Sequence, residues 1–149
     1  MSTYFNTAAQ LYAFFHDFFG RLRTDASVAS HILELRANLR FVITDPDAEI
    51  TIDTRPPGGL VIMGPSDVPC EIVLRMSADA GHRFWLGDLG LLAAVTRREV
   101  VVERGSLTKI LKLLPILKPA HVIYRQVLSE WEGRNADGDS TPSEPPRGG

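Results

Sequence analysis

The segment GSLTKILKLLPILKP, residues 105–119, constrains the possible folds more than any other part of the sequence. A surface helix usually has one apolar stripe that faces the core. In this segment the apolar residues spread over a much wider arc, and they are Leu107, Ile110, Leu111, Leu113, Leu114, Ile116 and Leu117. Such a helix must be covered on more than one side, and the commonest cover is a packed core.

Two helices are expected before the first strand. Residues 7–23 carry apolar side chains at helical spacing, and aromatic residues widen that face. Asp25 or Ser27 can cap a second helix, because both side chains accept hydrogen bonds from free backbone N–H groups. The apolar residues of this second helix recur at helical spacing as far as Leu39. We therefore expect both helices to pack on the core.

A change of period after Arg40 predicts a sheet. Short segments rich in Val, Ile and Thr alternate with Pro, Gly and Asp, which is typical of strands and turns. The expected strands cover residues 41–44, 49–54, 59–63, 70–76 and 98–105. RPPGG lies between the second and third of these segments, where Pro restricts φ and Gly accepts a positive φ. This turn chemistry predicts a β-hairpin.

The same reasoning predicts helices between and after the last strands. Ser77 or Asp79 can cap residues 78–97, which glycines divide into two brief helices. Ser106 can cap the Leu-rich helix, and Pro115 is a helix breaker near its end.

The end of the chain divides into a helix and a polar segment. Residues 120–131 have the pattern of an amphipathic helix. Residues 133–149 contain no large apolar residue, so their burial could not offset the loss of chain entropy. We expect one domain over residues 1–132, followed by a disordered polar tail.

Composition and charge limit the possible partners. The net charge is −2, which leaves no excess of basic residues for binding nucleic acid. Cys70 is the only cysteine, so an internal disulfide is impossible and a reducing cytoplasm is the expected location. The start lacks a basic signal region, and the apolar runs are too short to span a bilayer. We expect a soluble protein with at most transient membrane contact.

Catalytic and metal-binding motifs are absent from the sequence. The histidines have no metal-ligand spacing, and they are His16, His31, His82 and His121. No nucleophile elbow, phosphate loop or dinucleotide fingerprint is present. His82 could act as an acid or base with Asp79 and Asp88 nearby, but a solvated or capping histidine is the commoner case. We expect no metal, no cofactor and no catalysis.

The stretch IVLRMSADAGHRFWLGDLGLLAAVTRREVVVERGSLTKILKLL, residues 72–114, resembles the sterol carrier protein type two family. The family pattern is a strand, a short helix closing at Gly, a helix with small residues, a strand ending at Gly and a Leu-rich helix. The matching positions are Leu74, Met76, Ser77, Gly87, Ala93, Ala94, Val100, Val102, Gly105, Leu111 and Leu114. Two departures are TRRE before the last strand and Arg104 beside Gly105.

The resemblance implies a fold and a site. The fold would be α/β in the broad sense (α+β), with a five-stranded, mostly antiparallel sheet covered by helices and enclosing an apolar tunnel for lipids. The tunnel would be the second cover for the Leu-rich helix. The candidate ligand-binding residues are Met76, Phe84, Trp85, Leu89, Leu92, Val95, Leu111, Leu114, Leu117, Ile123 and Val127.

Three functions remain open at this point. The first is non-catalytic binding and transfer of a lipid, a sterol-like molecule or another hydrophobic small molecule. The second is an accessory module that docks an enzyme or forms a homodimer, with contacts from Tyr4, Phe5, Phe14 and Phe19. The third and weakest is an isomerase or cyclase that uses the same tunnel, with His82 as its base. The basic side chains of Lys109, Lys112, Lys118 and Arg125 could touch anionic lipid or a partner, or simply be solvated.

Overall fold

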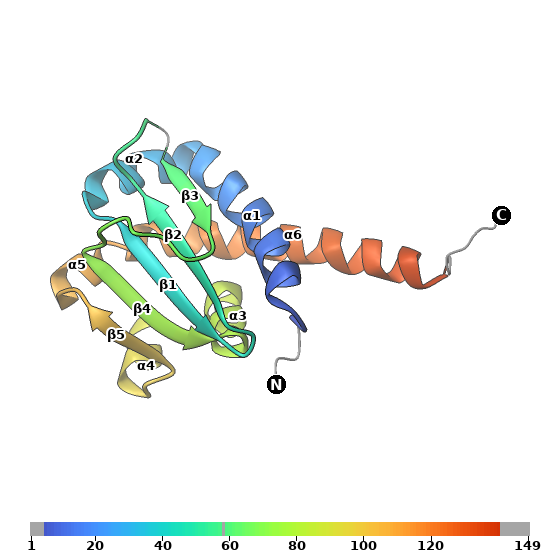
Figure 1. The fold of residues 1–149 in the computed structure, drawn as a ribbon. Helices are drawn as coiled ribbons and strands as arrows, with labels where there is room; N and C mark the ends of the chain where they lie inside the picture. The colour runs from blue at the N-terminus through green and yellow to red at the C-terminus, as the bar shows by residue number, and fades with distance from the viewer. Residues whose placement is uncertain (1–4, 58, 141–149) are drawn as a thin grey trace.

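The computed structural model describes residues 5–57 and 59–140. Among the described residues, helices come first and last, and all five strands lie between them (Figure 1). The elements are α1 (Ala8–Thr24), α2 (Ala26–Leu35), β1 (Leu39–Thr44), β2 (Ala48–Asp53), β3 (Leu60–Met63), β4 (Ile72–Ser77), α3 (Ala78–Leu86), α4 (Leu91–Thr96), β5 (Val100–Arg104), α5 (Leu107–Leu111) and α6 (Leu114–Ser140).

The strands form one five-stranded sheet in the order β3-β2-β1-β4-β5. β1 and β4 are parallel, and the other neighbouring pairs are antiparallel. This arrangement confirms the predicted α+β fold with a mostly antiparallel sheet. The hairpin predicted from RPPGG is also present, since β2 pairs antiparallel with β3 and Gly59 has φ 74°. The apolar tunnel stays a prediction, because the arrangement of the backbone does not test it.

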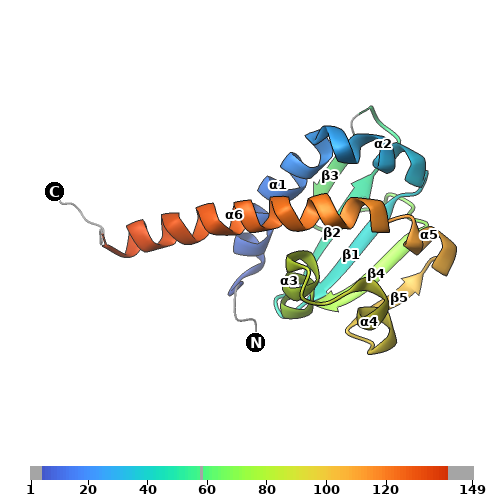
Figure 2. The same ribbon diagram turned by 180° about the vertical axis from the view of Figure 1, so that it is seen from behind.

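Helices cover one face of the sheet, called the inner face below. α1, α3 and α6 lie in front of the strands when the molecule is seen from behind (Figure 2). The inner face is apolar because alternate residues of the central strands point to it. These residues are Leu39, Phe41, Ile43, Ile50, Ile52, Ile72, Leu74 and Met76, and the registers of β1 with β2 and β4 align them. The core lies between this face and the helices.

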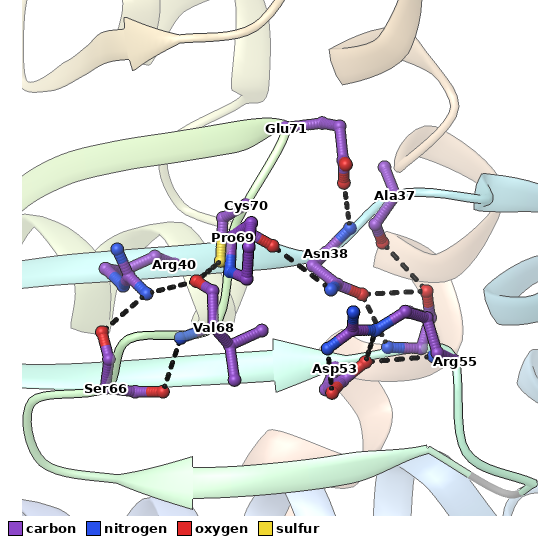
Figure 3. A network of polar contacts seen from close by, with 11 residues as sticks. Ala37, Asn38, Arg40, Asp53, Arg55, Ser66, Val68, Pro69, Cys70 and Glu71 are labelled. Carbon is purple, nitrogen blue, oxygen red and sulfur yellow. Dashed lines mark hydrogen bonds and ion pairs between the residues drawn. The ribbon is translucent and has the colours of Figure 1, made fainter.

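A network of hydrogen bonds holds the loop after β3 against the face of the sheet that is opposite the inner face (Figure 3). Arg40 donates to the carbonyl oxygens of Ser66 at 2.9 Å and Val68 at 2.6 Å. Asn38 is buried, and its side chain donates to the carbonyl of Pro69 and accepts from the N–H of Thr54. Buried polar groups stabilise a structure only when they are paired, as they are here. The network therefore fixes the start of β1.

The second helix is shorter than its apolar spacing predicts. α2 ends at Leu35, because Arg36 adopts the left-handed conformation with φ 48°. Leu39, expected on the helix, is the first residue of β1 and lies on the inner face. The prediction was wrong at this boundary because Leu39 continues the helical spacing and also begins the strand alternation.

The Leu-rich segment does not form one helix. α5 ends at Leu111, and α6 begins at Leu114 and continues through Pro119 into the last predicted helix. Pro115 lies in the first turn of α6, where a missing N–H leaves no hydrogen bond unmade. The expected break therefore comes before this proline rather than after it.

The polar tail expected over residues 133–149 stays a prediction. The backbone of α6 includes its first residues, up to Ser140. Residues 141–149 lie outside the described residues.

Candidate functional site

An apolar pocket of about 70 Å³ lies between the inner face and the helices. The sheet contributes side chains from four strands, and they are Leu39, Phe41, Ile52, Val61 and Leu74. The helical side contributes Phe19, Leu22, Ile32, Leu35, Phe84, Trp85, Leu113, Ile116 and Leu117. Arg23 and Thr54 complete the wall, yet no polar surface faces the space. The pocket therefore suits an apolar guest.

A second, smaller hollow of about 10 Å³ adjoins the pocket. Phe19, Phe41 and Trp85 line both spaces. Their rings contact one another, with centroids 5.9 Å apart for Phe19 and Phe41, 5.7 Å for Phe19 and Trp85, and 5.9 Å for Phe41 and Trp85. These three rings, called the aromatic partition below, separate the two spaces.

Local sequence places Phe84 and Trp85 in the wall. Ser77 caps α3, since its hydroxyl oxygen accepts from the N–H of Ala80 at 3.0 Å. Gly87 ends the helix with φ 92°. A Cβ at Gly87 would lie 3.1 Å from Nδ1 of His121, so glycine also permits the close approach of α3 to α6. The short helix is thus held between β4 and α6.

The Leu-rich segment is covered on one side by the pocket. Leu113, Ile116 and Leu117 line it, whereas Leu107 and Leu114 are exposed. Ile110 is buried outside the pocket wall. The apolar residues of this segment therefore divide into three groups, which line the pocket, pack in the core and lie on the exposed surface.

The structure brings some of the candidate ligand-binding residues together. Phe84, Trp85 and Leu117 line the pocket, and Met76 lines the smaller hollow. The others lie outside both walls. Three are buried in the core (Leu89, Ile123 and Val127), two are half-buried (Val95 and Leu111), and two are exposed (Leu92 and Leu114). Contact of any of these residues with a ligand remains a prediction.

Most of the pocket wall was not among the candidates. The missed residues include Phe19 and Leu22 of α1, Ile32 and Leu35 of α2, and Leu39 of β1. Their sequence signals are the broad apolar face of residues 7–23 and the alternation along the strands. Those signals indicate burial, but they do not separate a core position from a pocket position.

A buried polar contact between two helices lies away from the pocket. Nδ1 of His82 on α3 is 2.8 Å from the hydroxyl oxygen of Tyr124 on α6, and both side chains are buried. Burial lowers the pKa of His82, against the opposing charges of Asp79 and Asp88. His82 is in neither wall. It is therefore not placed to act on a molecule in the pocket.

Among residues 5–57 and 59–140, no group of three His, Cys, Asp or Glu side chains lies close enough to hold a metal ion. Within the same described ranges, every helix is too short or too polar to cross a membrane.

Comparison with solved structures identifies similar folds. The sequence matches no protein-family model and no curated protein. The sterol carrier protein domain 2 of Helicoverpa armigera aligns with a TM-score of 0.61 and 13% identity over 78% of this chain and 90% of that one. Sterol carrier protein 2 of Yarrowia lipolytica, in its apo form, aligns with a TM-score of 0.58 and 17% identity over 81% and 96%.

A similar fold also occurs within a larger enzyme. The stereoselective inverting sec-alkylsulfatase Pisa1 of Pseudomonas sp. aligns with a TM-score of 0.51 and 15% identity. The match covers 59% of this chain and 14% of the sulfatase. At these identities, all three comparisons concern the fold.

Proposed function

We propose that this chain, which has the fold of sterol carrier protein 2, binds a hydrophobic small molecule or lipid in the apolar pocket and transfers it unchanged. The observation that carries the proposal is the pocket wall. It draws side chains from both layers of the molecule and presents no polar surface. A reducing cytoplasm, inferred from the single cysteine, would be the place of action.

Empty space of this kind lowers stability. At about 24 cal/mol per Å³, a void of about 70 Å³ lowers the free energy of unfolding by about 2 kcal/mol. That is a substantial part of the 5–15 kcal/mol typical of a folded domain. A guest that fills the space would recover this free energy. This cost supports the proposal that a ligand occupies the space.

The pocket must expand to admit a lipid. An engineered apolar cavity of about 150 Å³ holds benzene, and the pocket is only about half that size. The helical wall of the pocket is interrupted between α5 and α6, at Lys112 and Leu113. We expect outward movement of this segment to enlarge the pocket.

The affinity would come almost entirely from apolar burial. Each methylene transferred from water contributes about 0.8 kcal/mol. Association costs about 4–15 kcal/mol, so a chain of several methylenes is needed before binding is observed. Such a site selects by size and apolarity, which suits a carrier that must also release its cargo.

A matched pair of variants on β3 tests the proposal. Val61 lines the pocket, and Leu60, its neighbour, points to the opposite face of the sheet. We expect Val61→Phe to fill the pocket and to reduce binding of an apolar fluorescent fatty acid at least tenfold. Leu60→Phe should bind this probe like the wild type. Native mass spectrometry of protein purified without detergent should show a copurified apolar molecule in wild type and Leu60→Phe.

Two results would contradict carriage in this pocket. One is absence of both a copurified molecule and probe binding in the wild type. The other is equal probe binding by Val61→Phe and Leu60→Phe, which would place the probe elsewhere.

The alternative functions receive less support. Phe5, Phe14 and Phe19, expected as contacts of a docking module, are buried, so that prediction was wrong. The reason is that α1 packs its aromatic residues against each other and against α6, as the ring contact of Phe14 with Tyr124 shows. Tyr4 lies outside the described residues. For an isomerase, the described pocket wall offers Arg23 as its only ionisable side chain.

A further inference from the structure

The segment that contains α5 and the first half of α6 carries basic residues and no acidic residue. Between Glu103 and Glu130 the sequence contains no acidic residue. The same stretch contains the basic residues Arg104, Lys109, Lys112, Lys118 and Arg125, although the whole chain has a net charge of −2. All three lysines of the chain lie in this stretch, which therefore has a local excess of positive charge although the whole chain is slightly negative.

Apolar and basic side chains share the exposed side of these helices. Leu107 is 57% exposed, Leu114 46% and Val122 55%. Lys112 and Lys118 are also exposed. Leu114, Lys118 and Val122 are four residues apart along α6 and so form one stripe. These five residues are called the outer face of α5–α6 below, and Figure 2 shows α6 crossing the sheet with α5 beside its first turn.

Neighbouring groups leave this charge largely uncompensated. Within the described residues, Lys112 and Lys118 have no carboxylate within ion-pair distance, and neither does Lys109. The positive charge of Lys109 acts on the carboxylate of Glu71 at longer range and helps to lower the pKa of Glu71. Arg125 lies 4.0 Å from Asp88 and donates to the carbonyl of Leu86. The lysines therefore remain available to an external anionic surface.

We propose that the outer face of α5–α6 docks on an anionic lipid bilayer. A helix surface that combines lysines with exposed leucines and lacks acidic residues is complementary to anionic headgroups above an apolar interior. The leucines would enter the boundary between headgroups and acyl chains, and the lysines would stay at headgroup level. A folded domain can dock in this way without a membrane-spanning segment.

Docking would bring the bilayer next to the pocket. Leu113, Ile116 and Leu117 line the pocket from the same segment that carries Leu114 and Lys118 outward. Movement of this segment at the bilayer would open the pocket toward the lipid. This consequence rests on the proposed function, whereas docking itself does not.

Vesicle binding of the ligand-free protein tests the proposal. We expect cosedimentation with vesicles that contain phosphatidylglycerol and little binding to vesicles of phosphatidylcholine alone. Binding should weaken as salt increases, because the Debye length falls from about 10 Å at 0.1 M salt to about 3 Å at 1 M. Equal binding to both kinds of vesicle, or no binding to either, would overturn the proposal.

Matched variants locate the surface. Each lysine near an anionic membrane changes the partition coefficient about fivefold, so Lys112→Gln with Lys118→Gln should lower it about 25-fold. Arg97→Gln with Arg98→Gln removes the same charge from the exposed end of α4 and should have little effect. Leu114→Ser should weaken binding, whereas Leu92→Ser, at a residue of α4 that is 58% exposed, should not. Equal losses in test and control variants would show an effect of total charge or hydrophobicity and would contradict the assignment.

A second measurement separates the remaining outcomes. Light scattering without vesicles should show a monomer for the wild type and for Leu114→Ser. A wild-type dimer that Leu114→Ser dissociates would make the outer face an interface between two copies and would overturn docking. Probe binding in the absence of vesicles tests the pocket separately, so the two proposals can fail independently.

Discussion

His82 and Tyr124 form a polar contact inside the core, between α3 and α6. The hydroxyl oxygen of Tyr124 is 2.8 Å from Nδ1 of His82, and burial lowers the pKa of the imidazole. Burial also lowers the pKa of His121, with Arg125 acting in the same direction. Folding therefore favours the neutral form of both imidazoles. Protonation is easier in the unfolded chain, so acid favours unfolding.

The stability of the protein should accordingly decrease in mild acid. The stabilisation by neutral His82 is complete above the ordinary histidine pKa of 6.5 and is lost as the pH falls below it. Each such group changes the free energy of unfolding by at most about 1.4 kcal/mol per pH unit. Urea unfolding at pH values from about one unit above 6.5 to about 1.5 units below it should show this slope. His82→Gln should reduce the slope, and His16→Gln, on the exposed side of α1, should not. An unchanged slope in His82→Gln would contradict this account.

At the scale of the element, helix ends decide how the chain enters the sheet. Arg36 adopts the left-handed conformation at the end of α2, with φ 48° and ψ 39°. Arg97 has the same position at the end of α4, but its φ is −84° and its ψ is 0°. An L-residue in the left-handed region costs about 1–2 kcal/mol, and glycine has no such cost. The turn that starts β1 is therefore made by a residue that is not suited to it.

Replacing each arginine with glycine should have opposite effects. Arg36→Gly removes the left-handed strain, which exceeds the extra chain entropy of glycine, and should raise the free energy of unfolding by up to about 1 kcal/mol. Arg97→Gly adds only entropy to the unfolded chain and should lower it by about 0.5–1 kcal/mol. Chemical denaturation of both variants measures the difference. A decrease of the same size in both would mean that the conformation of Arg36 is not strained.

At the scale of the whole molecule, the pocket links ligand binding to stability. Its wall joins α1, α2, α3 and α6 to the sheet, so a guest would contact most of the layers at once. The aromatic partition limits the depth of the pocket as it stands. A ligand that binds only the folded protein stabilises it by mass action.

An apolar ligand should therefore raise the melting temperature. At a free concentration of 100 times its Kd, the gain is about 2.7 kcal/mol, or roughly 5–10 °C for a domain of this size. Differential scanning fluorimetry with medium-chain fatty acids measures the shift. A short-chain fatty acid is the control, because it buries too little apolar surface to bind. Val61→Phe should lose the shift and Leu60→Phe should keep it. A shift that survives in Val61→Phe would place the ligand outside the pocket.

The sequence by itself determines the fold class and most of the local elements, but not the end of α2 or the break between α5 and α6. Ile72, Leu74 and Met76 alternate along their strand, and all three are buried on the inner face. Ser77 and Ser106 cap helices as their side-chain chemistry predicts. These features depend on spacing and on short-range hydrogen bonds, so neighbouring residues are enough to specify them.

The tertiary structure alone decides where the pocket lies and which residues face it. Leu114 and Leu117 belong to the same apolar segment, yet Leu114 is exposed and Leu117 lines the pocket. Phe19 and Leu39 also line it, although their patterns indicate only burial. The spacing of apolar residues in the sequence indicates which side chains are buried. A void is the volume left where side chains of several elements do not meet, so its position depends on all of them together.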